Sequence, residues 1–85
     1  MNNNEILATV GGVEITNADF EAYLQSVPQE QRMYAANPQF RGQFLEQLIS
    51  MYAYAKFAEE MKLDETDEFK KILENAKREI LANLA

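Results

Sequence analysis

The side chains of this chain that could do chemistry are mainly carboxylates, and none has an obvious activating neighbour. The chain carries 14 acidic and 8 basic residues, with no cysteine and no histidine. Thiol nucleophiles, imidazole acid–base catalysis and zinc sites of the usual kind are therefore excluded. Ser26 and Ser50 lack a histidine that could activate them, and Lys56 is interpreted as a solvated helix residue rather than a Schiff-base lysine.

The acidic residues are densest at Glu59-Glu60 and over 64–68, where a helix is predicted to end and another to begin. Solvated acids are normal at a helix start, because the helix dipole favours them there. A calcium-type loop would also need a glycine among its oxygen ligands, and this loop has none. Gly11-Gly12 has no third glycine or Lys-Ser/Thr after it, so it is not a phosphate loop. We expect no catalytic residue, metal or cofactor here, and predict that this segment alone is not an enzyme.

Length and charge limit the possible partners. Eighty-five residues, 47% of them hydrophobic and 26% charged, predict one small folded domain covering 1–85. The net charge of −6 and the scattered basic residues argue against nucleic acid as a partner. No run approaches the roughly 18 apolar residues that span a bilayer, so no membrane insertion is expected. The first residues lack the basic and apolar regions of a signal peptide. They predict a cytoplasmic protein if Met1 is the native start, and otherwise an extracytoplasmic one, at the cell surface or in the periplasm.

The pattern of apolar residues predicts a β-hairpin over about 5–15. Ile6, Ala8 and Val10 alternate along the first strand and should share one side of it. Two glycines between β-type residues favour a tight hairpin turn, since such turns need positive φ at both central positions.

Four helical segments are predicted after the hairpin. Thr16 and Asp19 are placed to cap the first helix, Pro28 ends it, and Asn37 and Thr66 are good N-caps further on. The fold class is therefore mainly α: an N-terminal β-hairpin, a short helix, a short helical turn, a long central helix and a closing helix. The predicted helical ranges are about 17–26, 29–35, 38–62 and 67–84.

The long central helix carries two apolar arcs, although a surface helix needs only one. The first arc, expected to face the core, consists of Phe44, Leu45, Leu48, Ile49, Tyr52 and Ala55. The second, roughly on the other side, consists of Phe40, Met51, Tyr54, Phe57 and Met61. The surplus of apolar surface is the first indication of a binding function.

The last helix carries a single apolar stripe at helical spacing. Its members are Phe69, Ile72, Leu73, Ala76, Ile80, Leu81 and Leu84. The pattern is still running at Ala85 and no glycine cap follows, so we expect the chain to be a fragment of a longer one.

The run Val10–Leu24, VGGVEITNADFEAYL, resembles the opening of parvulin-type peptidyl-prolyl isomerases that carry a SurA- or PrsA-like chaperone lobe. These begin with a strand, a V-N-G-x-x-I-T turn and a helix reading D-F near its start. Gly11 replaces the usual asparagine, which is still compatible with positive φ. The likeness continues through 28–32 and 44–49 and ends at 63–64, 68–69 and 76–78, so it covers nearly the whole chain. The residues that fit the opening motif are Val10, Gly12, Ile15, Thr16, Asp19 and Phe20.

The resemblance implies a lobe, similar to the peptide-binding domains of SurA and trigger factor, that binds unfolded polypeptide. In such proteins a separate parvulin domain isomerises X–Pro bonds, and a final helix after that domain often returns to complete the lobe. None of the parvulin residues is present here, so no catalytic position can be transferred. A missing helix would leave part of the second arc uncovered.

The leading hypothesis is therefore a chaperone lobe that binds unfolded or nascent polypeptide through an apolar groove, in a parent protein that is a prolyl isomerase. The alternative is an interaction module that forms a homodimer or domain-swapped pair without general chaperone activity. Self-association is expected in either case, because large apolar patches seldom stay open on monomers. Each candidate side chain could instead pack against the first helix and the hairpin. The candidate peptide-binding residues are Met33, Tyr34, Phe40, Met51, Tyr54, Phe57 and Met61.

Overall fold

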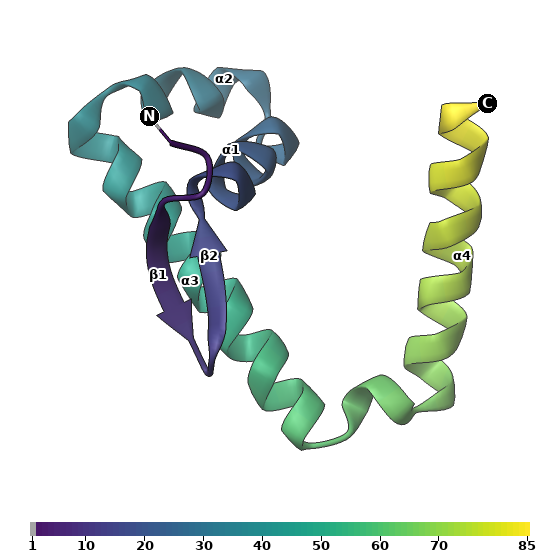
Figure 1. Ribbon diagram of the computed structural model, residues 1–85. Coiled ribbons are helices and arrows are strands. Elements are labelled where there is room, and N and C mark those ends of the chain that lie inside the picture. Colours follow the sequence, from purple (N-terminus) through teal and green to yellow (C-terminus); the bar gives the residue numbers. More distant parts are fainter. Residues whose placement is uncertain (1) are drawn as a thin grey trace. The chain divides into compact units, whose positions relative to one another are not determined.

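The computed structural model describes residues 2–85 and has the predicted fold class, mainly helical with an N-terminal hairpin (Figure 1). The chain forms two compact units, one that runs to Tyr54 and one formed by Ala55–Ala85. The first contains the hairpin and the core. That 1–85 acts as a single domain stays a prediction.

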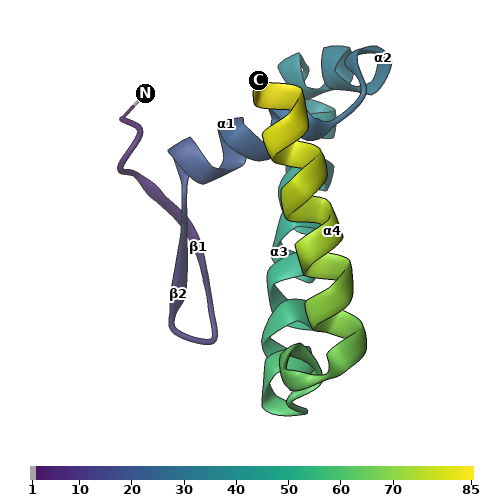
Figure 2. The same cartoon turned by 90° about the vertical axis from the view of Figure 1, so that its right-hand side faces the viewer.

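The hairpin consists of β1 (Ile6–Val10) and β2 (Val13–Thr16), which pair antiparallel (Figures 1 and 2). Val10 lies opposite Val13, so the loop is the two glycines alone. Gly11 has φ of 56° and Gly12 of 85°. Positive φ at both positions is what a two-residue hairpin turn needs, and the predicted turn is confirmed.

The predicted alternation along β1 is wrong at its start. Ile6 pairs with Thr16 and Ala8 with Ile15, so Leu7 is an extra residue that forms a bulge. The bulge reverses the side on which the residues before it lie. Leu7 packs against the core and Ile6 is 52% exposed, whereas Ile6 was expected to share a side with Ala8.

α1 (Asn17–Ser26) has the predicted bounds and the predicted cap. The backbone N–H of Asp19 donates to the Thr16 hydroxyl over 3.2 Å, and the N–H of Thr16 donates to the Asp19 carboxylate over 2.9 Å. The two bonds satisfy two amides at the junction between β2 and α1. This capping box fixes the direction in which α1 leaves the hairpin.

The short segment predicted as 29–35 consists of α2 (Gln29–Arg32) followed by the 3₁₀ turn η1 (Met33–Ala36). Next comes α3 (Pro38–Glu60), with the Asn37 side chain accepting from the N–H of Gln39 over 2.9 Å. Proline at the first helical position loses no hydrogen bond there, as expected.

α3 ends two residues before the predicted position 62. Lys62 adopts a left-handed conformation with φ of 61°, which ends the helix without the glycine that usually occupies such a position. The 3₁₀ turn η2 (Leu63–Glu65) follows, and then α4 (Asp67–Leu84), whose bounds match the prediction. The hydroxyl of Thr66 caps α4 by accepting from the N–H of Phe69 over 3.1 Å.

The core lies in the first unit, where α1 and β2 pack against one face of α3. Leu45, Ile49 and Tyr52 pack around it, which confirms most of the first arc. Ala55 does not belong to the core, since it is exposed and lies in the second unit. The buried core residues are Ile15, Phe20, Leu24, Val27, Ala35, Phe44 and Leu48.

Replacing Thr16 with alanine should lower the free energy of unfolding by about 1 kcal/mol, because the backbone amide of Asp19 loses its side-chain acceptor. Thr16→Ser, which keeps the hydroxyl, is the matched control and should cost clearly less. Urea titration followed by circular dichroism measures both. Equal losses for the two variants would contradict the importance of the cap.

Candidate peptide-binding surfaces

In the first unit, most of the predicted binding residues are exposed. Met33 and Tyr34, on η1, are 74% and 58% exposed, and Met51 and Tyr54, on α3, are 51% and 75% exposed. Phe40 is only partly exposed. These side chains are not needed to fill the core, and each of the four exposed ones leaves apolar surface open to a partner.

Tyr34 and Phe40 contact each other. Their ring centroids are 5.6 Å apart and the planes meet at 72°, an edge-to-face arrangement. The pair borders a shallow hollow of about 250 Å³ whose other walls include Phe44 and the amide side chains of Gln43 and Gln47. The contact explains why Phe40 is less exposed than the rest of the second arc, and it links η1 to the start of α3.

Met51 and Tyr54 are three residues apart on α3, so their side chains are neighbours on one face of the helix. Leu48, three residues before Met51, is 2% exposed in the core, so Met51 lies at the border between the two arcs and Tyr54 lies further round the helix. The two arcs differ in burial over this part of α3, since Leu48 is buried and both Met51 and Tyr54 are exposed.

In the second unit, Phe57 and Met61 are 60% and 56% exposed. This unit contains its own hollow of about 380 Å³, between the end of α3, η2 and the start of α4. The hollow is lined by Ala55, Ala58, Glu59, Leu63, Asp64 and Phe69.

α4 is a strongly amphipathic helix in which no residue is buried. Its apolar stripe is predicted from helical spacing, but the stripe residues are not among the candidate peptide-binding residues. The exposed large side chains of its stripe are Phe69, Ile72, Leu73, Ile80, Leu81 and Leu84, at 41–78%.

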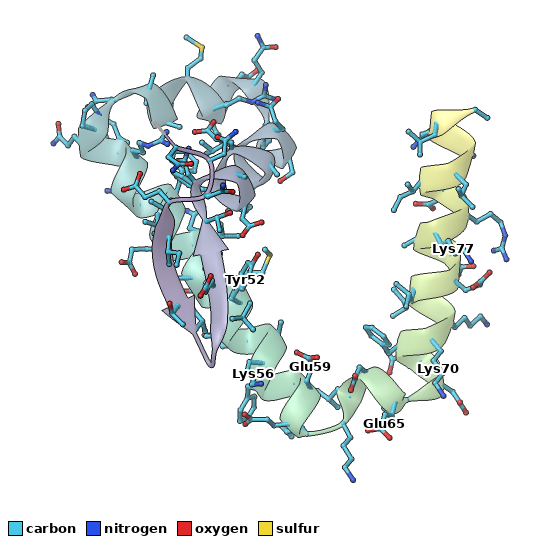
Figure 3. All side chains as sticks on the ribbon, viewed as in Figure 1. Tyr52, Lys56, Glu59, Glu65, Lys70 and Lys77 are labelled. Carbon is cyan, nitrogen blue, oxygen red and sulfur yellow. The ribbon has the colours of Figure 1, made fainter. Side chains whose placement is uncertain are left out.

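Several charged side chains of the second unit extend from its two helices. Lys56 and Glu59 extend from the end of α3, and Lys70 and Lys77 from α4 (Figure 3).

Over residues 2–85, the acidic side chains form no group of three or more that could hold a metal ion. Within the same range, no helix combines the length and apolar character needed to cross a membrane.

Comparisons of the chain with family models, with curated proteins and with solved structures found no match. The function of the chain is therefore inferred from its own residues and from the motif resemblance described above.

The burial pattern predicts effects of very different size on the free energy of unfolding for two residues of α3. Leu48→Ala should lower the free energy of unfolding by about 2–5 kcal/mol, since it opens a cavity in the core. Met51→Ala should change it by no more than about 0.5 kcal/mol, since the side chain is half exposed. Urea titration of the two variants tests this. A cost for Met51→Ala as large as that for Leu48→Ala would show that the second arc is structural.

Proposed function

We propose that this chain is a chaperone lobe that binds unfolded or nascent polypeptide through its exposed apolar side chains. The observation that carries the proposal is the exposure of the second arc and of η1. Six of the seven candidate residues, all but Phe40, are at least half exposed, from 51% to 75%. Exposed apolar side chains are common singly, but several at regular spacing on one helix mark an interaction surface.

The kinds of side chain also suit a varied set of partners. Methionine is unbranched and polarisable, so it can repack against differently shaped side chains. Tyr34 and Tyr54 add flat surfaces with a hydroxyl that can remain in water while the ring is covered. A surface built from such groups favours loose recognition of many sequences over one fixed partner.

The charge of the chain is consistent with recognition by burial rather than by ion pairing. With 14 acidic and 8 basic residues, the protein repels other acidic chains at long range. The apolar contacts must therefore supply the affinity, and burying one Met, Phe or Leu side chain is worth about 1.5–3 kcal/mol. Binding of an uncharged unfolded chain should depend little on salt.

The resemblance of Val10–Leu24 to the SurA- and PrsA-like lobes supports the proposal that this function belongs to a larger protein. In this proposal the parent chain is a parvulin-type prolyl isomerase whose catalytic domain lies outside the present sequence. The segment itself binds clients and does not catalyse isomerisation. A proline-peptide assay that detected catalysis by this segment would overturn that part of the proposal.

A second candidate function is self-association through α4. Its apolar stripe lies on a single face and is exposed along the whole helix. A stripe of this kind on an 18-residue helix is typical of helices that pair with another helix. Under this alternative the chain is a homodimerisation module without general chaperone activity.

The chaperone proposal predicts that polar replacement of the exposed arc weakens client binding. The double variant Met51→Ser and Tyr54→Ser tests the first unit, and Phe57→Ser with Met61→Ser tests the second. Each should weaken binding by about tenfold or more, because two buried apolar contacts are lost. The measurements are binding of a hydrophobic fluorescent dye and suppression of aggregation of an unrelated unfolded protein.

The matched control replaces two solvated residues of the same helix, Lys56→Ser with Glu60→Ser, and should leave both readouts unchanged. If the folded wild-type chain neither binds the dye nor suppresses aggregation, the chaperone proposal fails. If the apolar and control variants behave alike, binding does not use the second arc.

The alternative function predicts that Ile72→Glu converts a dimer into a monomer, because a charge in the middle of the α4 stripe cannot be buried without a partner. Lys71→Glu, on the polar side of α4, is the control and should leave the dimer intact. Sedimentation equilibrium distinguishes them. A wild-type chain that remains monomeric at high concentration would remove this alternative.

A further inference from the structure

A second hollow of about 280 Å³ lies in the first unit, away from the residues of the second arc. One wall is a face of α3 on which Pro38, Arg41, Gly42 and Leu45 succeed one another at i, i+3, i+4 and i+7. Gly42 stands in the middle of this face and contributes no side chain to it.

Gly42 is not required by the packing of the chain itself. It lies in the second turn of α3, where glycine costs stability relative to alanine. A Cβ atom built at this position meets no other heavy atom within 4 Å. Its φ is not positive either, so no backbone conformation demands glycine. The absence of a side chain leaves open the space that lines the hollow.

The opposite wall carries a polar group without a partner. Asn17, at the start of α1, is 4% exposed, and its amide oxygen accepts no hydrogen bond from residues 2–85. A buried acceptor without a donor costs free energy, and native structures contain few of them. A half-turn about χ2 exchanges the amide oxygen and nitrogen, so the side chain can offer either an acceptor or a donor to a molecule in the hollow.

The remaining lining favours an uncharged, apolar occupant. Leu7 and Phe20 supply apolar surface, as Leu45 does from α3. Two full charges are present, on Glu5 and Arg41, and they have opposite signs. The Arg41 guanidinium is also committed elsewhere, 3.0 Å from the Glu21 carboxylate and 4.7 Å from the Phe20 ring centroid.

The volume fits one large aliphatic side chain with part of its backbone. A cavity of about 150 Å³ is enough to hold benzene, whereas sites for drug-sized ligands begin near 300 Å³. An extended peptide supplies both an aliphatic side chain, which suits the apolar walls, and a main-chain N–H or C=O group, which can bond to the Asn17 amide.

We propose that the hollow between β1, α1 and the first half of α3 is a subsite for an aliphatic side chain of an extended polypeptide, with Asn17 bonding to its main chain and Gly42 making the room. The inference rests on the proposed chaperone function and deepens it. It assigns to the first unit a preference for Leu, Ile or Val that the broad surface of methionine and tyrosine does not impose.

The experiment uses the full chain and a short fluorescein-labelled peptide with a central Leu-Val-Leu between Gly and Ser residues, with binding measured by fluorescence anisotropy. A peptide with Ser in place of the three aliphatic residues is the ligand control. Gly42→Leu should raise the midpoint of urea unfolding, because leucine is a good helix former and fills open apolar space, and should weaken peptide binding by about tenfold or more. Gly42→Ala should lie between wild type and Gly42→Leu.

Ser50→Ala, an exposed position on the same helix, is the matched control: it should raise the unfolding midpoint slightly and leave binding unchanged. Asn17→Leu provides a second variant, which should retain the fold and weaken binding, because an apolar replacement removes the unpaired amide.

Equal binding by wild type and Gly42→Leu would overturn the subsite, as would a fall in the unfolding midpoint of Gly42→Leu, since the space would then not be open. A wild-type chain that suppresses aggregation but does not prefer the aliphatic peptide over its serine control overturns the subsite and leaves the chaperone proposal standing. A wild-type chain that does neither overturns both.

Discussion

The structure depends on the packing of α1 and β2 against one face of α3. Phe20, Ile15 and Leu48 are the largest fully buried side chains, and they come from these three elements. Everything that positions them is local: two glycines close the hairpin, a capping box turns the chain into α1, and Asn37 with Pro38 begins α3. The buried core is small, and it involves only part of α3. Met51 and Tyr54, further along the same helix, carry apolar surface that the core does not use.

Most of this fold could be predicted from the sequence, because its determinants lie within a few residues of one another. The hairpin turn follows from Gly11-Gly12, and the start of α1 from Thr16 with Asp19. The bounds of α4 follow from Thr66 and the spacing of its apolar stripe. Helical periodicity separated an arc that contains Leu48, which is buried, from an arc that contains Met51, which is 51% exposed. Periodicity alone left open whether the second arc packs inside or faces solvent.

What could not be predicted depends on contacts between elements or on conformations without a sequence signal. The bulge at Leu7 arises from the pairing register of β1 with β2, which the residues of β1 do not determine. The left-handed Lys62 ends α3 early although lysine does not favour that conformation. Periodicity shows that α4 has an apolar face, but not whether another part of the chain buries it. The hollow beside Gly42 is formed by residues of three elements. The sequence alone therefore indicates only that Gly42 destabilises the helix slightly.

The central claim is that the exposed apolar side chains bind another polypeptide, and the methionines allow a direct measurement of it. Met33, Met51 and Met61 are 74%, 51% and 56% exposed, and their methyl groups can be labelled with carbon-13 and observed by NMR. On addition of an unfolded, non-aggregating polypeptide, our account predicts that these methyl resonances shift or broaden in proportion to the fraction bound. Buried Leu24 and Leu48, labelled in the same way, should shift far less. Unchanged methionine resonances at a saturating concentration of that polypeptide would contradict the account.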